Sequence, residues 1–152
     1  MIRVQKEAFD TAVELAALRQ QRQDIGGTVI FVGTVRELSD GAQVSTMTLE
    51  HYPGMTEKAL ADIDDEAHRR WPLLDTLIIH RFGRLAPGDD VVLVIATSSH
   101  REAAFEACHF LIDWLKTKAP FWKLEGGPAG DNWVAAKSSD DKSAARWEKP
   151  AS

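Results

Sequence analysis

The sequence predicts a single α+β domain in which three helices pack on mainly antiparallel strands. Short runs rich in β-branched and aromatic residues are typical of strands, and they recur between turns that contain Gly or Pro. Longer segments with apolar residues three and four positions apart are typical of amphipathic helices. The order of these segments is β-α-β-β-α-β-β-α-β-β, without an internal repeat or a linker, which favours one domain of helices on strands.

The first half of the chain contains two of the expected helices. Asp10 can cap a helix that runs to about Arg19. Gly33 interrupts an apolar run, which indicates a bulge or a close backbone approach within a strand. Pro72 ends the second helix, because the residue before a proline avoids the helical conformation. The expected elements are a strand at 2–6, a helix at 10–19, a strand at 28–35, an exposed loop at 37–43, a strand at 44–51 and a helix at 55–70.

The second half contains the best-defined helix. Ser99 and Glu102 have the spacing of a capping box, and Pro120 ends the helix. The apolar residues of a core-facing stripe are Phe105, Cys108, Ile112 and Leu115. The strands expected around this helix are 74–84, 90–97, 121–125 and 132–136. The strand at 90–97 is apolar on both faces, which predicts a central place in its sheet.

The last residues differ in composition from the rest of the chain. Residues 138–152 are rich in charged and small polar side chains. We therefore expect a domain at residues 1–137 and a polar C-terminal tail at 138–152. The tail is either loose or anchored by Trp147.

Composition argues against several functional classes. The net charge of −5 disfavours binding of nucleic acid over a broad face, although an acidic protein can still hold a local basic pocket. No apolar run reaches the roughly 18 residues of a membrane-spanning helix, and the N-terminus lacks a signal-peptide layout, so we expect a soluble, cytoplasmic protein. The single cysteine, Cys108, can form no intramolecular disulfide, and its neighbours on the predicted helix favour a buried position over nucleophilic chemistry. No metal or cofactor motif is present, and His51 and His80 stand in polar clusters without metal-binding spacing.

The segment Ser98–Arg101 lies where a strong predicted strand enters the long helix. Unpaired backbone N–H groups and the helix dipole favour anions there. Arg101 can make a forked contact with phosphate or carboxylate, and His100 can donate or exchange a proton. A solvated Arg101 is the alternative. Arg36, which ends an apolar strand before a loop, is either a ligand-binding arginine or an ordinary surface residue.

Two lysines flank the predicted end of the long helix. Lys116 lies in the final turn, where the helix dipole alone accounts for a cation. Lys123 is expected to share one strand face with Phe121 and Glu125. Apolar neighbours can lower the pKa of a lysine and suit it to proton transfer or charge stabilisation. A plain ion pair with Glu125 is the alternative for Lys123.

Five collinear segments resemble the large, catalytic subunit of molybdopterin synthase. They are Phe31–Arg36, Leu49–Met55, His80–Gly83, Ser99–Phe105 and Leu115–Glu125. The resemblance runs from about Val4 to Trp147 and so covers nearly the whole chain. It implies an α/β-hammerhead fold and a homodimer of large subunits. It also implies a ubiquitin-like small subunit at each end, which makes the assembly a heterotetramer.

The resemblance further implies a sulfurtransferase of molybdenum cofactor biosynthesis that needs no cofactor of its own. The C-terminal Gly-Gly thiocarboxylate of the small subunit would give sulfur to cyclic pyranopterin monophosphate, and two transfers would build the dithiolene of molybdopterin. By motif position, Lys116 and Lys123 match the catalytic lysines. The implied substrate-binding residues are Phe31, Arg36, His100, Arg101 and Lys137. Lys137 stands where an arginine is expected, which puts a bidentate phosphate contact in doubt there.

The positions of these residues predict a pocket that two chains share. His100 and Lys116 stand near opposite ends of one helix, about 24 Å apart at ~1.5 Å per residue. We therefore expect Lys116 and Lys123 of one chain to face His100 and Arg101 of another. Two alternatives remain open. One is a non-catalytic module that binds an anionic ligand or a ubiquitin-like protein tail, and the other is an unrelated α+β scaffold whose lysines only cap a helix.

Overall fold

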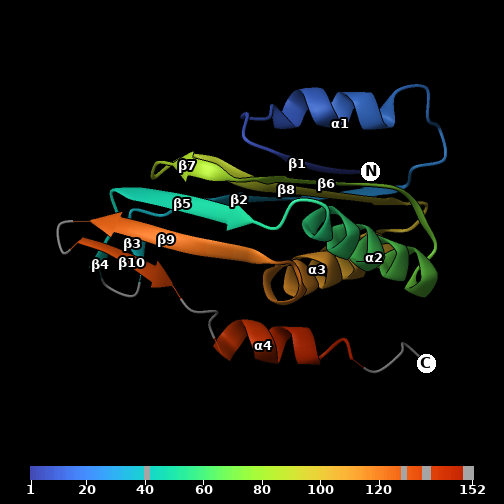
Figure 1. Ribbon diagram of the computed structural model, residues 1–152. Coiled ribbons are helices and arrows are strands. Elements are labelled where there is room, and N and C mark those ends of the chain that lie inside the picture. Colours follow the sequence, from blue (N-terminus) through green and yellow to red (C-terminus); the bar gives the residue numbers. More distant parts are fainter. Residues whose placement is uncertain (40–41, 128–129, 135–137, 149–152) are drawn as a thin grey trace.

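Two four-stranded sheets organise the chain in the computed structural model, which describes residues 1–39, 42–127, 130–134 and 138–148 (Figure 1). The first sheet, in the order β1-β6-β8-β2, consists of β1 (Ile2–Gln5), β6 (Leu73–Arg81), β8 (Asp90–Ser98) and β2 (Gly27–Thr34). The second sheet, in the order β10-β9-β5-β7, consists of β10 (Gly130–Val134), β9 (Phe121–Gly127), β5 (Thr46–His51) and β7 (Gly83–Leu85). A short hairpin pairs β3 (Leu38–Ser39) with β4 (Ala42–Gln43).

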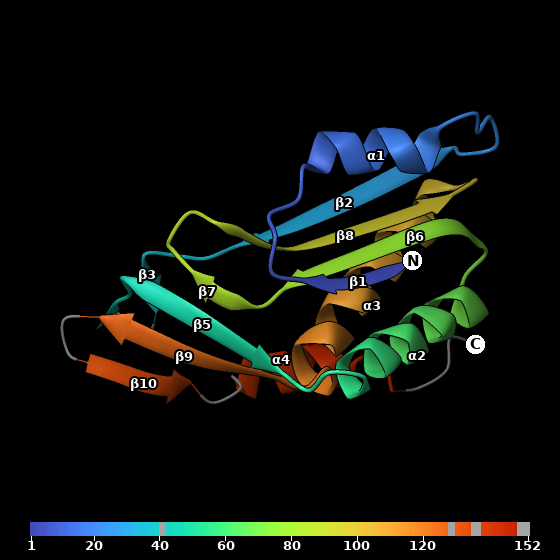
Figure 2. The ribbon, with the colours of Figure 1, turned by 45° about the horizontal axis from the view of Figure 1, so that its top comes forward.

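Helices lie on both faces of the first sheet (Figure 2). The helices are α1 (Thr11–Arg19), α2 (Met55–Arg70), α3 (Arg101–Lys118) and α4 (Ser138–Ala145). All described strand pairs are antiparallel except β1 with β6, so the predicted α+β class with mainly antiparallel strands is confirmed. The helix count is corrected from three to the four found among these residues. None of these helices is both long and apolar enough to cross a bilayer.

The core has one layer on each face of the first sheet. On one face, α2 and α3 pack on strand side chains such as Ile78 and Val94, and Phe110 of α3 belongs to the same cluster. On the other face, α1 covers a smaller cluster that includes Leu77 and Ile95. Strand β8 lies between β6 and β2 and is buried along most of its length, which confirms the predicted central strand.

The predicted capping box at the start of the long helix is wrong. Helix α3 begins at Arg101 with His100 as its N-cap residue, and no side chain caps it. The hydroxyl of Ser99 donates instead to the carbonyl of Asp24 at 3.2 Å. Ser99 therefore stabilises the loop before β2 and does not cap the helix. The predicted end of the helix is confirmed, because Ala119 before Pro120 has an extended conformation.

In two further segments, the observed strands differ from the predicted ones. The strand expected at 74–84 is divided into β6 and β7, because Gly83 has a φ of 89° and the chain turns there into the second sheet. The loop expected at 37–43 carries the β3–β4 hairpin on either side of residues 40–41, which lie outside the described residues.

The C-terminal segment packs on α3. Its helix, α4, was not expected from the sequence, but the predicted anchor is present. The indole N–H of Trp147 donates to a carboxylate oxygen of Asp113 at 2.7 Å, and its ring meets Trp71 edge-on at 5.5 Å. The expected boundary between domain and tail falls at residues 135–137, outside the described residues.

Candidate active site

Lys116 and Lys123 lie on the two sides of the turn that joins α3 to β9. Lys116 is exposed in the last turn of α3, and Lys123 is exposed in β9, where it pairs with Leu49 of β5. Pro120 ends the helix, and the N–H of Phe121 donates to the carbonyl of Ala119 at 2.9 Å. The tight turn therefore places the two lysines on either side of the short connection between α3 and β9 (Figure 1).

A group of four rings lies beside this turn, and we call it the His–Phe cluster: His51, His80, Phe82 and Phe121. His80 stacks on Phe121, with ring centroids 3.7 Å apart and planes inclined by 16°. His51 approaches Phe82 at 4.3 Å and Phe121 at 6.1 Å, and its Nδ1 lies 3.2 Å from the hydroxyl of Thr56. The cluster links β5, which carries His51, and β6, which carries His80, to β9, which carries both Phe121 and Lys123.

His80 is neutral at neutral pH. Burial lowers the pKa of its imidazole to about 4, and the proximity of Lys123 and His51 acts in the same direction. Only the hydrogen bond to the carbonyl of Arg81, at 2.8 Å, opposes this shift. Because a carbonyl can only accept, Nδ1 carries the proton and Nε2 carries a lone pair.

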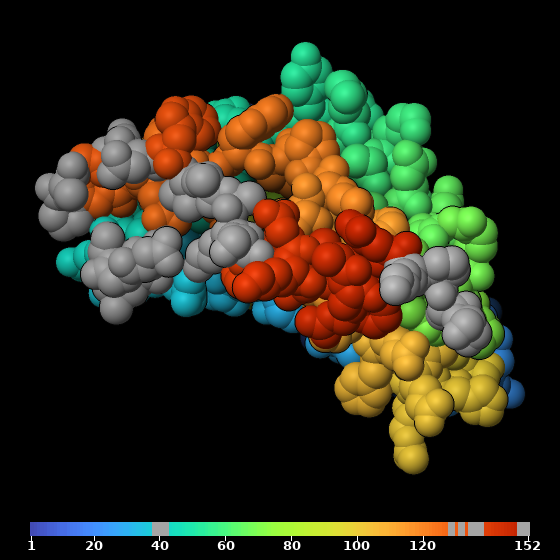
Figure 3. All heavy atoms as spheres, turned by 90° about the horizontal axis from the view of Figure 1, so that it is seen from below, coloured from blue at the N-terminus to red at the C-terminus, as the bar shows by residue number. Residues whose placement is uncertain are grey.

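The other basic residues of α3 lie at its opposite end. His100 and Arg101 are exposed, and with Gly26, Ser99 and Glu102 they line an open hollow of about 440 Å³. Gly26 allows a close approach there, since a Cβ on it would stand 2.0 Å from the carbonyl oxygen of Ser99. In Figure 3, the gold atoms near residue 100 and the orange atoms near residue 120 lie on opposite sides of the C-terminal segment.

The length of α3 supports the predicted separation. Eighteen residues span about 27 Å at ~1.5 Å per residue. Within one chain, His100 and Arg101 therefore do not meet Lys116 and Lys123.

Two further predicted residues lie on or after β2. Phe31 pairs with Val94 and is half-buried against the core between the first sheet and α3. Arg36 is exposed just beyond β2, near the start of β8, because the two strands are antiparallel. Helix α3 returns along β8, so Arg36 lies at the same end of the molecule as Lys116. Lys137 lies outside the described residues.

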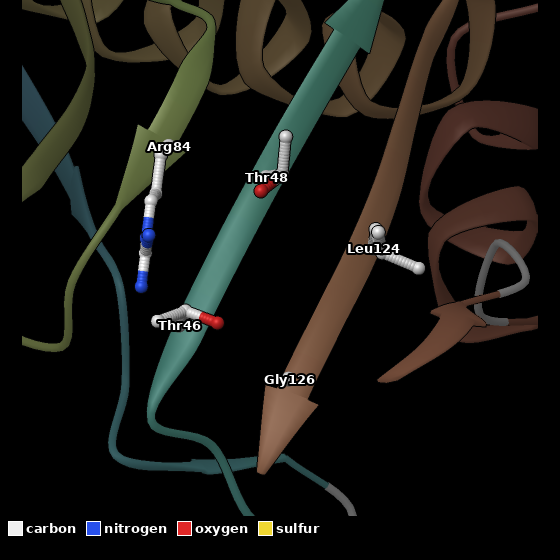
Figure 4. A pocket seen from close by; sticks show the side chains of 5 residues that line it. All are labelled: Thr46, Thr48, Arg84, Leu124 and Gly126. Atoms are coloured by element: carbon white, nitrogen blue, oxygen red, sulfur yellow. The ribbon is translucent and has the colours of Figure 1, made fainter. Parts of the chain in front are cut away.

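A second hollow, of about 260 Å³, lies on the second sheet (Figure 4). Its lining residues are Thr46, Thr48, Arg84, Leu124 and Gly126. Side chains alternate along a strand, so Leu124 faces away from the side of β9 that carries Lys123. This hollow is therefore not part of the lysine site.

The remaining nucleophile and metal candidates give no second site in the described ranges. Burial raises the pKa of the Cys108 thiol to about 12, so the reactive thiolate is disfavoured. No group of three His, Cys, Asp or Glu residues that could hold a metal ion occurs in the described part of the chain. From the sequence, His51 and His80 are only polar residues without metal-binding spacing. Their ring contacts with Phe82 and Phe121 depend on how distant strands pack, so the sequence alone does not indicate them.

Comparison with known proteins identifies relatives along nearly the whole chain. The family model described as MoaE protein matches residues 4–118. A curated protein of Pseudomonas aeruginosa, named molybdopterin synthase catalytic subunit, is 55% identical over 148 residues, which cover 97% of this chain and 99% of the relative. A solved molybdopterin biosynthesis MoaE protein from Burkholderia ambifaria has a TM-score of 0.83 and 54% identity, with 97% of each chain covered.

A more distant solved structure has the same fold. It is the complex of subunits 1 and 2 of the molybdopterin-converting factor from Helicobacter pylori, with a TM-score of 0.74 at 19% identity. The match covers 90% of this chain and 91% of that one.

Proposed function

Because this chain belongs to the MoaE protein family, whose curated relatives are sulfur-transferring catalytic subunits of molybdopterin synthase, we propose that its two lysines carry out sulfur transfer. The donor is the C-terminal Gly-Gly thiocarboxylate of a ubiquitin-like small subunit, and the acceptor is cyclic pyranopterin monophosphate. Two transfers yield the dithiolene of molybdopterin. The observation that carries the proposal is the pair of exposed lysines, Lys116 and Lys123, on either side of one tight turn.

Each lysine has a distinct role in this proposal. The sulfur of the thiocarboxylate forms a C–S bond to the pterin side chain as a C–O bond at that carbon breaks, and the oxygen leaves as water or with the opened phosphate. The bond between that sulfur and the terminal carbonyl carbon is then hydrolysed, with water supplying the new carboxylate oxygen. The ammonium of Lys116 stabilises the oxyanion that develops on the terminal carbonyl. Lys123 supplies charge or a proton to the pterin. Both side chains are exposed, so a substrate and a protein tail can reach them.

Anionic parts of the substrate bind to the other basic residues. Phe31, Arg36 and Lys137 belong to the same pocket, and His100 and Arg101 come from a second copy of the chain. The supporting observation is the ~27 Å length of α3, which keeps His100 away from Lys116 within one protomer. The proposed assembly is a homodimer of this chain with one small subunit at each end. The Helicobacter pylori complex of two subunits has the same fold and supports a small-subunit partner.

The cytoplasm is the proposed compartment, since a thiocarboxylate is an oxidisable sulfur group and the cytosol keeps such sulfur reduced.

A single-turnover assay tests the reaction. The chain, mixed with a thiocarboxylated small subunit and the cyclic monophosphate, is expected to yield a pterin with two added sulfurs, measured by mass spectrometry. Stable complex formation without transferred sulfur would instead identify a non-catalytic binding module.

A mixing experiment tests the shared site. Lys116→Ala and Arg101→Ala chains are each expected to be inactive, whereas a heterodimer of the two regains one intact pocket. With random exchange of chains, roughly a quarter of the wild-type activity should return. The matched control mixes Lys116→Ala with Lys123→Ala. These residues belong to the same half of the site, so no intact pocket forms. Equal recovery in both mixtures, or none in the first, contradicts a site shared in this way.

A further inference from the structure

His80 is the buried titratable residue next to Lys123 that the proposed reaction does not use. It lies on the same face of β6 as Ile78, the face of the first sheet that α2 and α3 cover, and only 7% of its surface is exposed. Its imidazole stacks on Phe121, two residues before Lys123 in β9. Phe121 and Lys123 share one face of that strand, so the imidazole lies on the lysine side of β9.

The protonation of this imidazole leaves one nitrogen as an acceptor. Nδ1 donates to the carbonyl of Arg81 at 2.8 Å, and burial keeps the ring neutral, so Nε2 carries the lone pair and can act as an acceptor. The titratable groups that act on the ring come from two neighbouring strands, Lys123 from β9 and His51 from β5. Lys123 therefore extends from the side of β9 on which this neutral, buried imidazole lies.

We propose that Nε2 of His80 accepts a hydrogen bond from the ammonium of Lys123 and so acts as a positioning residue for it. The stack on Phe121 and the bond to Arg81 fix the imidazole from two directions. A hydrogen bond to the charged form of a lysine favours that form. His80 thus keeps Lys123 protonated and directs it toward the pterin. This inference rests on the proposed function of Lys123.

Three substitutions of His80 separate its contacts. His80→Asn retains a donor near the position of Nδ1 but has no acceptor at the position of Nε2. His80→Gln places an amide oxygen near the position of Nε2. His80→Phe retains an aromatic ring against Phe121 and removes both polar atoms. The exposed His109 of α3, which contacts Asp113 and Trp147, provides the control His109→Asn.

The expected result is a selective loss of rate. In His80→Asn and His80→Phe, kcat for sulfur transfer should fall on the order of tenfold with little change in KM, because misplacement of a catalytic group affects the transition state. The pKa of Lys123 should also fall, so activity is lost at lower pH on the alkaline side. His80→Gln should recover part of the rate, and His109→Asn should behave as the wild type.

A titration that does not depend on turnover completes the test. The chemical shift of the 13C-labelled Lys123 side chain, assigned by its loss in Lys123→Ala, should titrate at lower pH in His80→Asn than in the wild type. An unchanged lysine titration, or equal losses in the Asn and Gln variants, overturns the positioning role. Full activity of Lys123→Ala would instead overturn the proposed function, while the titration would still report the contact.

Discussion

Replacing either active-site lysine should nearly abolish sulfur transfer. In Lys116→Ala and in Lys123→Ala, we expect the single-turnover rate to fall by about 10²- to 10⁴-fold. Lys116 would no longer stabilise the developing oxyanion, and Lys123 would no longer supply charge or a proton to the pterin. Rapid-quench analysis of the thiolated pterin measures both rates. Both lysines are exposed, so the midpoint of unfolding should change little.

Lys118 provides a matched control in the same helical turn. Its ammonium lies 4.7 Å from the centre of the Trp114 ring, so its contact is with the protein. Lys118→Ala removes the same side chain two residues from Lys116 and should retain nearly the full rate. If all three alanine variants lose activity equally, the loss comes from the positive charge of this region rather than from the two lysines. Wild-type rates in both Lys116→Ala and Lys123→Ala would contradict their proposed roles.

Local sequence patterns predicted most of the secondary structure. Pro120 ends α3 through a steric effect on its immediate neighbour, so the end of that helix could be read directly. The start of α3 could not, because the Ser99 hydroxyl has two possible partners and the one it takes, Asp24, lies on a different segment. The division between β6 and β7 likewise depends on which sheet each segment joins, and neighbouring residues do not determine that.

For the candidate site too, the sequence predicted the features that depend on neighbouring residues and missed those that depend on distant contacts. Lys116 and Lys123 stand next to a proline-terminated helix, and the helix length alone separated them from His100. His80 was visible only as a polar residue in an apolar strand. Its place on the Lys123 side of β9 depends on the stack on Phe121, which joins two sheets across a long stretch of chain. Such contacts carry no local sequence signal, because they depend on how the sheets pack.

Phe110 should be among the residues most important for stability. Its side chain is fully buried in α3, and its ring lies 5.3 Å from that of Trp71 and 4.5 Å from that of Trp114. The indole of Trp147 meets it edge-on at 5.9 Å, so Phe110 also supports the C-terminal segment. We expect Phe110→Ala to lower the free energy of unfolding by about 3–5 kcal/mol, because the large cavity cannot close among rigid aromatic rings.

Urea unfolding at a fixed protein concentration measures this loss, followed by the fluorescence of the surrounding tryptophans. The matched control is Phe105→Ala on the same helix. The predicted core-facing place of Phe105 is wrong, because the buried side of α3 at this level consists of Ala104 and Cys108. Since 62% of Phe105 is exposed, little packing is lost. Its unfolding free energy should stay within about 0.5 kcal/mol of the wild type. Equal midpoints for the two variants would contradict a core centred on Phe110. If Phe110→Ala lowers the free energy of unfolding and also exposes Trp147, the C-terminal segment depends on this core, because the Phe110 ring contacts both.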